Sequence, residues 1–166
     1  MVRMKTVAAV VALSVLAAGC SRGEAESSEP VPSAAEAATQ EAAPPPGPPA
    51  ADDVTTLDGV TYASLTGDAA SGKSAFMQCR TCHVVDPGMN RVGPSLANII
   101  GREAGSVSGF RYSDANANSG ITWTEEKLFQ FLEKPQRVIP KTKMIFAGMP
   151  DVQKRADVIA YLKNPS

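Results

Sequence analysis

Two of the chain's three cysteines and its only histidine lie together in the short segment Cys79-Arg-Thr-Cys82-His83. Three cysteines are too few for a disulfide framework. One histidine and two neighbouring cysteines also fall short of the four ligands that a structural zinc site requires. The fold of this chain must therefore place two thiols and an imidazole side by side, and neither a disulfide framework nor a structural zinc site explains the arrangement.

The spacing Cys-x-x-Cys-His is the attachment pattern of c-type haem. Two thiols at positions i and i+3 lie on the same side of a helical turn, where each can add to one vinyl group of a porphyrin. His83 then presents its imidazole to the iron as one axial ligand. A thioredoxin-like Cys-x-x-Cys would need a βαβ frame, and half of a zinc site would need further ligands; the sequence offers neither. We therefore predict one haem c, bound covalently through Cys79 and Cys82.

The segment that contains this motif, residues 67–166, reads as one small all-α domain. Helices are expected over four stretches: Asp68 to about Arg80, Ser95 to Ile100, Thr124 to Pro135, and Asp151 to Pro165. Long loops, notably 102–120 and 135–150, join them, and strand signals are poor. Three to five short helices with few aromatic residues form a thin core, so a bulky apolar group in the middle is expected to organise the loops.

The N-terminus has the pattern of an export signal. A basic head precedes an apolar run from Val7 to Ala18, which as a helix is about 18 Å long, short of the roughly 30 Å of membrane hydrocarbon. The run ends in small residues before Cys20 and resembles a bacterial lipobox, although Ala17 stands where leucine is usual. We predict a lipoprotein-type signal peptide over 1–19 and lipidation of Cys20. The alternative is an ordinary signal cleaved near Ala18, which would leave a soluble periplasmic protein.

A flexible tether is expected over residues 20–66, which are rich in alanine, proline and glutamate. Residues 21–66 contain eight acids and one base, and they lack the apolar periodicity needed to offset the entropy of ordering. The part from Val54 to Leu65 has some β-like character and could lie on the domain. The acidic run is interpreted as a solvated, self-repelling spacer.

The domain itself is mildly basic, with thirteen bases and nine acids over residues 67–166. Six of the bases gather mostly in its second half: Lys127, Lys134, Arg137, Lys141, Lys143 and Lys154. This patch is too weak for nucleic acid. It suits loose electrostatic steering of a monomeric protein toward acidic faces of redox complexes in the membrane. The alternative is a scatter of solubilising charges.

Residues 67–166 resemble class I cytochrome c, and in particular its mitochondrial-type branch, over essentially the whole domain. Besides Cys79 to His83, four regions carry the resemblance: Gly93-Pro-Ser-Leu96 with Gly101-Arg102, Phe110 to Trp123, Ile139 to Gly148, and Arg155 to Lys163. They are similar to the stretch beneath the histidine ligand, the loop over the haem propionates, the methionine-ligand loop and the C-terminal helix. The resemblance also implies a crossing of the first and last helices at Gly72, Phe76, Val158 and Tyr161.

A thioether is the expected second axial ligand, because soft sulfur suits iron and raises its potential. Met77 shares the attachment helix, and Met89 follows His83 too closely to reach the opposite haem face easily. Met144 and Met149 remain from the residues alone, with Met144 favoured by its Thr-Lys-Met-Ile-Phe frame. The resemblance implies Met144, so the metal ligands are predicted to be His83 and Met144.

Further roles follow from the resemblance for residues around the haem. The Pro94 carbonyl would accept a hydrogen bond from the His83 imidazole and orient the ring. Arg102, Tyr112 and Trp123 would hydrogen-bond or screen a propionate, which is otherwise a costly, partly buried charge. Plain core packing is the alternative for Tyr112 and Trp123, and a surface charge is the alternative for Arg102.

The resemblance also implies roles for residues on the Met side of the haem. Asn116 and Thr142 would bind an internal water there, and Phe146 would cover the haem edge. Two positions depart from the family pattern. Phe131 replaces a tyrosine whose hydroxyl bonds the methionine sulfur, and Lys141 replaces a glycine, which predicts loop strain if that position needs a positive φ.

With protein ligands on both sides, the iron has no open position for oxygen or peroxide. The sequence therefore predicts an electron-transfer protein rather than an enzyme. Its expected role is that of a lipid-anchored carrier on the periplasmic side of a bacterial membrane. It would shuttle electrons from a quinol-oxidising complex to a haem-copper oxidase or a photosynthetic reaction centre. The alternatives are a peroxidase-like enzyme, if Met144 dissociates, and a fixed subunit of an oxidase or dehydrogenase complex.

Overall fold

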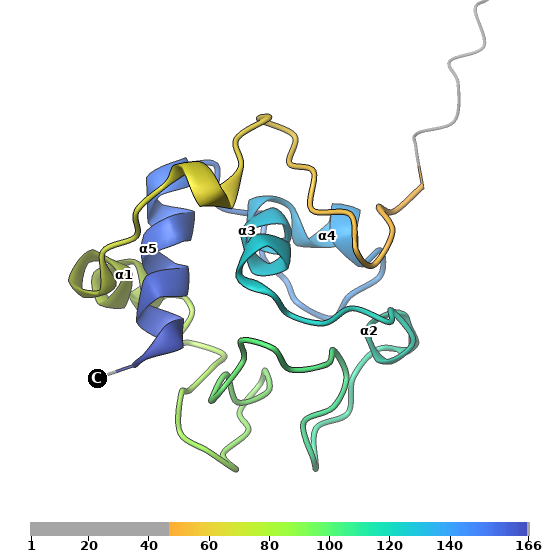
Figure 1. Cartoon of the computed structure of the whole chain (residues 1–166). Coiled ribbons are helices and arrows are strands. Elements are labelled where there is room, and N and C mark those ends of the chain that lie inside the picture. The colour runs from red at the N-terminus through yellow and green to blue at the C-terminus, as the bar shows by residue number, and fades with distance from the viewer. Residues whose placement is uncertain (1–46, 166) are drawn as a thin grey trace, which may run out of the picture. The chain divides into compact units, whose positions relative to one another are not determined.

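The computed structural model describes residues 47–165 (Figure 1). The predicted signal peptide, Cys20 and the tether up to residue 46 lie outside the described residues. The helical elements, with η for 3-10 turns, are η1 Tyr62–Ser64, α1 Ala69–Ala75, η2 Phe76–Gln78, α2 Asp114–Ala117, α3 Glu125–Glu133, α4 Pro135–Val138 and α5 Val152–Lys163. Over 47–165 the β-structure amounts to one isolated antiparallel bridge, Glu103 to Thr122. The prediction of an all-α fold of short helices and long loops is confirmed.

Three of the four predicted helices begin at their predicted caps. The side chains of Asp68, Thr124 and Asp151 each accept a hydrogen bond from the backbone N–H three residues later, at 2.7, 3.1 and 3.1 Å. These bonds satisfy N–H groups that lack an intrahelical partner, and each helix starts there for that reason. Pro135 ends α3 as predicted, but it also opens the short helix α4, in which a proline at the first position is favourable.

The helix predicted over 95–100 is wrong, because the structure has only turns there. The Arg102 guanidinium binds the carbonyl oxygens of Ala97 at 2.7 Å and Ser95 at 2.9 Å, which are acceptors that a helix would have used itself. Asn98 has a φ of +51°, a left-handed conformation that interrupts any helix. A side chain from the following loop therefore replaces the helix hydrogen bonds.

Helix α2 was not predicted, since it lies inside the loop assigned to residues 102–120. Ser113 caps it by accepting from the Asn116 backbone N–H at 3.3 Å, and Asp114 lies in its first turn. A serine followed by an acid is a helix-start signal, but one turn carries no apolar periodicity that could have identified it.

The first and last helices cross at Gly72, as the resemblance implied (Figure 1). A Cβ on Gly72 would lie only 1.9 Å from the Asp157 carbonyl oxygen, so only glycine permits this approach. The rings of Phe76 and Tyr161 pack with their centroids 5.2 Å apart, and Val158 is buried beside them. The crossing fixes α1, and with it the Cys-x-x-Cys-His segment that follows, against the C-terminal helix.

Residues 50–66 pack on the domain, so the tether predicted over 20–66 is corrected for this part, and the alternative that Val54 to Leu65 lie on the domain agrees with the structure. The Lys127 amine donates to the backbone carbonyls of Ala50 at 2.9 Å and Asp53 at 2.7 Å. The Gln130 side chain donates to the Thr55 carbonyl at 2.8 Å. We call residues 50–66 the strap. It lies along α3 and α4 before the chain enters α1 (Figure 1).

Candidate functional site

The two thiols and the imidazole lie on one helical turn that continues from η2. The backbone N–H groups of Cys82 and His83 both donate to the Cys79 carbonyl, at 3.1 and 2.9 Å. Both cysteines are free and half-buried. Burial, with a smaller contribution from the neighbouring Cys82, raises the pKa of the Cys79 thiol to about 11. The turn presents two thiols at the spacing that attachment of a porphyrin requires.

The His83 ring is held in one orientation. Its Nδ1 lies 2.8 Å from the Pro94 carbonyl oxygen, so Nδ1 donates and Nε2 keeps its lone pair. A Cβ on Gly93 would lie 2.3 Å from Cε1 of the ring, so the backbone itself forms the wall behind the imidazole. Burial lowers the pKa of His83 despite the hydrogen bond to Pro94, which acts in the opposite direction. The neutral imidazole is the form that ligates a metal.

The structure separates the four methionines of the domain. Met77 and Met89 are 58% and 50% exposed, and they lie on the surface. Met149 is 4% exposed and belongs to the hydrophobic core. Met144 is half-buried at the edge of that core. Met144 is therefore the methionine placed neither in solvent nor in the closed core, as a thioether facing a prosthetic group should be.

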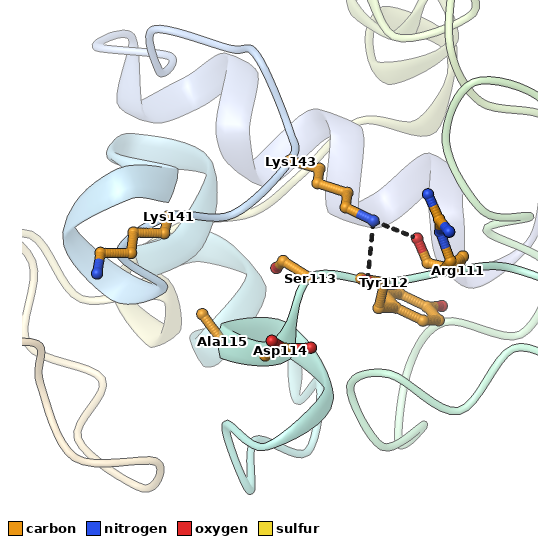
Figure 2. Close-up of a pocket in the computed structure, with 7 residues that line it drawn as sticks. All are labelled: Arg111, Tyr112, Ser113, Asp114, Ala115, Lys141 and Lys143. Carbon is orange, nitrogen blue, oxygen red and sulfur yellow. Dashed lines mark hydrogen bonds between the residues drawn. The ribbon is translucent and has the colours of Figure 1, made fainter.

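Residues 139–149, which carry Met144, form what we call the Met loop. The Lys143 amine donates to the carbonyl oxygens of Arg111 and Tyr112, both at 3.0 Å, and so ties the loop to the segment before α2 (Figure 2). An open cavity of about 500 Å³ lies at this contact, lined by Arg111, Tyr112, Ser113, Asp114, Ala115, Lys141 and Lys143. Its rim is basic, with three cationic side chains and one carboxylate. The sequence placed Lys143 only in the basic patch and did not indicate that it anchors the loop.

Two buried polar atoms beside the site have no protein partner. Arg102 directs its two terminal nitrogens at carbonyl oxygens, but its buried Nε is unpaired, and so is the buried Oδ1 of Asn116. Burial lowers the pKa of Arg102 and raises that of Tyr112, so a carboxylate beside the guanidinium would be favourable. Unpaired buried groups are costly and call for a partner. A haem propionate and an internal water fit these two positions.

The other predicted site residues have different surroundings. Trp123 is 6% exposed and packs on Phe131, with ring centroids 4.8 Å apart. Thr142 accepts a hydrogen bond from the Met144 backbone N–H at 3.3 Å, which helps to shape the Met loop. Phe146 is half-buried against the core. The contact of Trp123 with Phe131 is core packing, which the sequence analysis gave as the alternative to a hydrogen bond with a propionate.

The expected strain at Lys141 is present, because this residue has a φ of +65°. A side chain at positive φ costs about 1 kcal/mol, and glycine avoids this cost. We predict that Lys141→Gly raises the free energy of unfolding by about 1 kcal/mol, measured by denaturant titration of the holoprotein. Lys141→Ala is the matched control, because it removes the charge but keeps the Cβ. An equal gain in both variants would assign the effect to charge and refute backbone strain.

Comparison with known proteins agrees with this geometry. The family model described as Cytochrome c matches residues 69–166. Cytochrome c2 of Blastochloris viridis is 56% identical over 97 residues, which cover 58% of this chain and 76% of the relative. Cytochrome c type-1 of Ascaris suum is 51% identical over 98 residues, covering 58% and 88%. The solved structure of cytochrome cH from Methylobacterium extorquens matches with a TM-score of 0.56 and 45% identity, over 58% of this chain and 98% of that one.

The fold and the site of residues 47–165 define a class I cytochrome c: short helices, and no strands within this range, around a Cys-x-x-Cys-His turn. The chain belongs to the cytochrome c family. It carries haem c attached through Cys79 and Cys82, and it transfers electrons rather than acting as an enzyme. The predictions of the cofactor and of electron transfer are thereby confirmed.

Proposed function

We propose that this protein is a lipid-anchored one-electron carrier with His83 and Met144 as the axial ligands of its iron. The placement of Met144 carries the proposal, since it alone of the domain's four methionines is half-buried at the core edge. Bound haem supplies an Fe(III)/Fe(II) couple. The chain's residues hold its surroundings fixed: Pro94 orients the imidazole, and Arg102 and Asn116 offer polar atoms to the cofactor's polar edge.

Docking is proposed to occur at the basic rim formed by Arg111, Lys141 and Lys143, next to the Met loop. Their charge would steer the carrier toward acidic faces of membrane redox complexes, such as a quinol-oxidising complex and a haem-copper oxidase or a reaction centre. Such steering raises the rate of encounter without requiring a tight complex. This suits a protein that must leave each partner after one electron.

The proposed location at the membrane rests on the sequence of the N-terminus. None of the helices within residues 47–165 is long and apolar enough to cross a bilayer. The apolar run up to Ala18 and the small residues before Cys20 support export and lipidation on the periplasmic side. Residues 21–49 would then be the tether, since the strap contacts begin at Ala50. A tether of this kind confines the carrier near its partners and raises its effective concentration there.

Replacing the proposed lipidation site tests this location. We predict that Cys20→Ser moves the protein from the membrane fraction to the soluble periplasmic fraction, with an unchanged haem spectrum. Ser21→Ala, one position later, is the matched control and should stay with the membrane. If Cys20→Ser still sediments with membranes after a high-salt wash, lipid anchoring is refuted. Elution of the wild type within a stable oxidase complex after gentle solubilisation would instead favour a fixed subunit.

A further inference from the structure

The strap connects to the Met loop through one buried arginine. Arg155 in α5 has no exposed surface, and its guanidinium lies over the Phe129 ring, 4.3 Å from the centroid. One terminal nitrogen donates to the Met149 carbonyl oxygen at 2.8 Å, at the end of the Met loop. The other terminal nitrogen pairs with the Asp58 carboxylate of the strap. Asp58 and Met149 therefore share one rigid cation.

The strap also holds the beginning of the Met loop. Arg137 in α4 donates to the Thr55 carbonyl of the strap at 3.0 Å. Helix α4 leads directly into the loop, and the Ile139 backbone N–H donates back to Pro135 at 2.9 Å. From the same helix, the Gln136 amide donates to the Thr142 carbonyl inside the loop at 3.2 Å. Both ends of the loop are thus tied, through one side chain each, to residues 55–58.

We propose that the strap braces the Met loop at both ends and keeps Met144 on the iron, with Asp58 as the main positioning residue. The inference rests on the proposed role of Met144 as ligand. The strap precedes residue 69, where the match to the family begins, so it is an added element that acts on the shared site. A brace of this kind would let a protein with a strained Lys141 retain a closed loop.

Loss of the Asp58 charge should act on the loop rather than only on the strap. Glu133 Oε1 lies 4.0 Å from the Arg155 terminal nitrogen and is the acid left for this buried cation. A guanidinium shifted toward Glu133 would give up part of its bond to the Met149 carbonyl. A buried cation does not remain unpaired, so this shift is the expected response to removal of its partner. The C-terminal end of the loop would then open more often and expose the iron to external ligands.

The test uses the full-length ferric holoprotein and added imidazole, which competes with Met144 for the iron. Displacement is followed by loss of the weak near-infrared band that reports the bond between sulfur and iron. We expect Asp58→Asn to raise imidazole affinity about tenfold, because the shifted Arg155 gives up its charge-assisted hydrogen bond to the Met149 carbonyl, which holds the loop closed. Asp157→Asn is the matched control. The Asp157 carboxylate also lies in α5 and accepts a hydrogen bond from the N-terminal part of the domain, namely from the Asp68 N–H at the start of α1, at 2.9 Å. None of its hydrogen bonds goes to the Met loop.

A purely structural strap gives a different result. Asp58→Asn and Asp157→Asn would then raise imidazole affinity by the same factor at equal loss of stability in denaturant titration, and the proposal would be overturned. Arg137→Gln, a change at a partly exposed position, tests the other end of the loop if Asp58→Asn does not fold. An increase of less than about twofold there would also overturn bracing. A wild type without the near-infrared band would instead refute Met144 as ligand, and the bracing proposal with it.

Discussion

Met144→Ala should abolish the weak near-infrared band of the oxidised protein while leaving the covalent haem in place. Alanine offers no sulfur, so the position opposite His83 opens to water or to small ligands. The reduction potential should fall by on the order of a few tenths of a volt, a fraction of the roughly 0.8 V over which axial ligands set haem potentials. The reduced variant should also bind carbon monoxide rapidly at neutral pH, which the wild type should not.

Met149→Leu is the control for that result, because Met149 is the other methionine at a suitable place in the sequence. It is 4% exposed, and its backbone N–H donates to the Leu132 carbonyl at 2.8 Å, so it is packed in the core. Leucine has a similar volume and should cost less than about 1.5 kcal/mol of stability. The band should persist. Loss of the band in Met149→Leu and its survival in Met144→Ala would reverse the ligand assignment. Rapid carbon monoxide binding by the wild type would favour the peroxidase-like alternative.

The parts of the fold that the sequence predicted are those determined by neighbouring residues. The caps at Asp68, Thr124 and Asp151 act on N–H groups three residues away, and the Cys-x-x-Cys-His turn is local as well. The hydrogen bond from His83 to Pro94 spans eleven residues, and the resemblance rather than any local pattern implied it. Local chemistry was therefore sufficient for these three helix starts and for the haem attachment, although it did not identify the single turn of α2.

The packing of the strap, which the sequence left open, depends on partners far away in the chain. Lys127 binds Ala50 and Arg155 binds Asp58 across separations of 77 and 97 residues. The strap alone looks like a solvated acidic spacer, because the contacts that hold it on the domain are made by side chains of α3, α4 and α5. The wrong helix over 95–100 has a nearer cause, since the Arg102 guanidinium, only two residues beyond this segment, binds the carbonyls of Ser95 and Ala97. Helix propensity depends on the residues of a segment alone, so it does not report side chains outside the segment that bind its backbone.

The crossing of α1 and α5 positions the Cys-x-x-Cys-His turn to which the haem is attached. The two helices are so close at this crossing that no side chain larger than that of glycine fits between them. Gly72 is buried where the two backbones meet. A Cβ there would lie 1.9 Å from the Asp157 carbonyl oxygen and 2.9 Å from Tyr161 Cβ. Both obstacles belong to the backbone or to the stem of a packed residue, so neither can move aside without displacement of the helix. The displacement would also separate the Phe76 and Tyr161 rings, whose centroids are 5.2 Å apart.

We predict that Gly72→Ala lowers the free energy of unfolding of the holoprotein by about 3 kcal/mol, at the upper end of the cost of overpacking. Helix propensity alone predicts the opposite sign, a gain of about 1 kcal/mol, so the direction of the change decides which effect dominates. Denaturant titration measures it. Ser74→Ala, at an exposed position of the same helix, is the control and should change stability by less than about 0.5 kcal/mol. A Gly72→Ala protein more stable than the wild type would show that the helices do not cross at this residue.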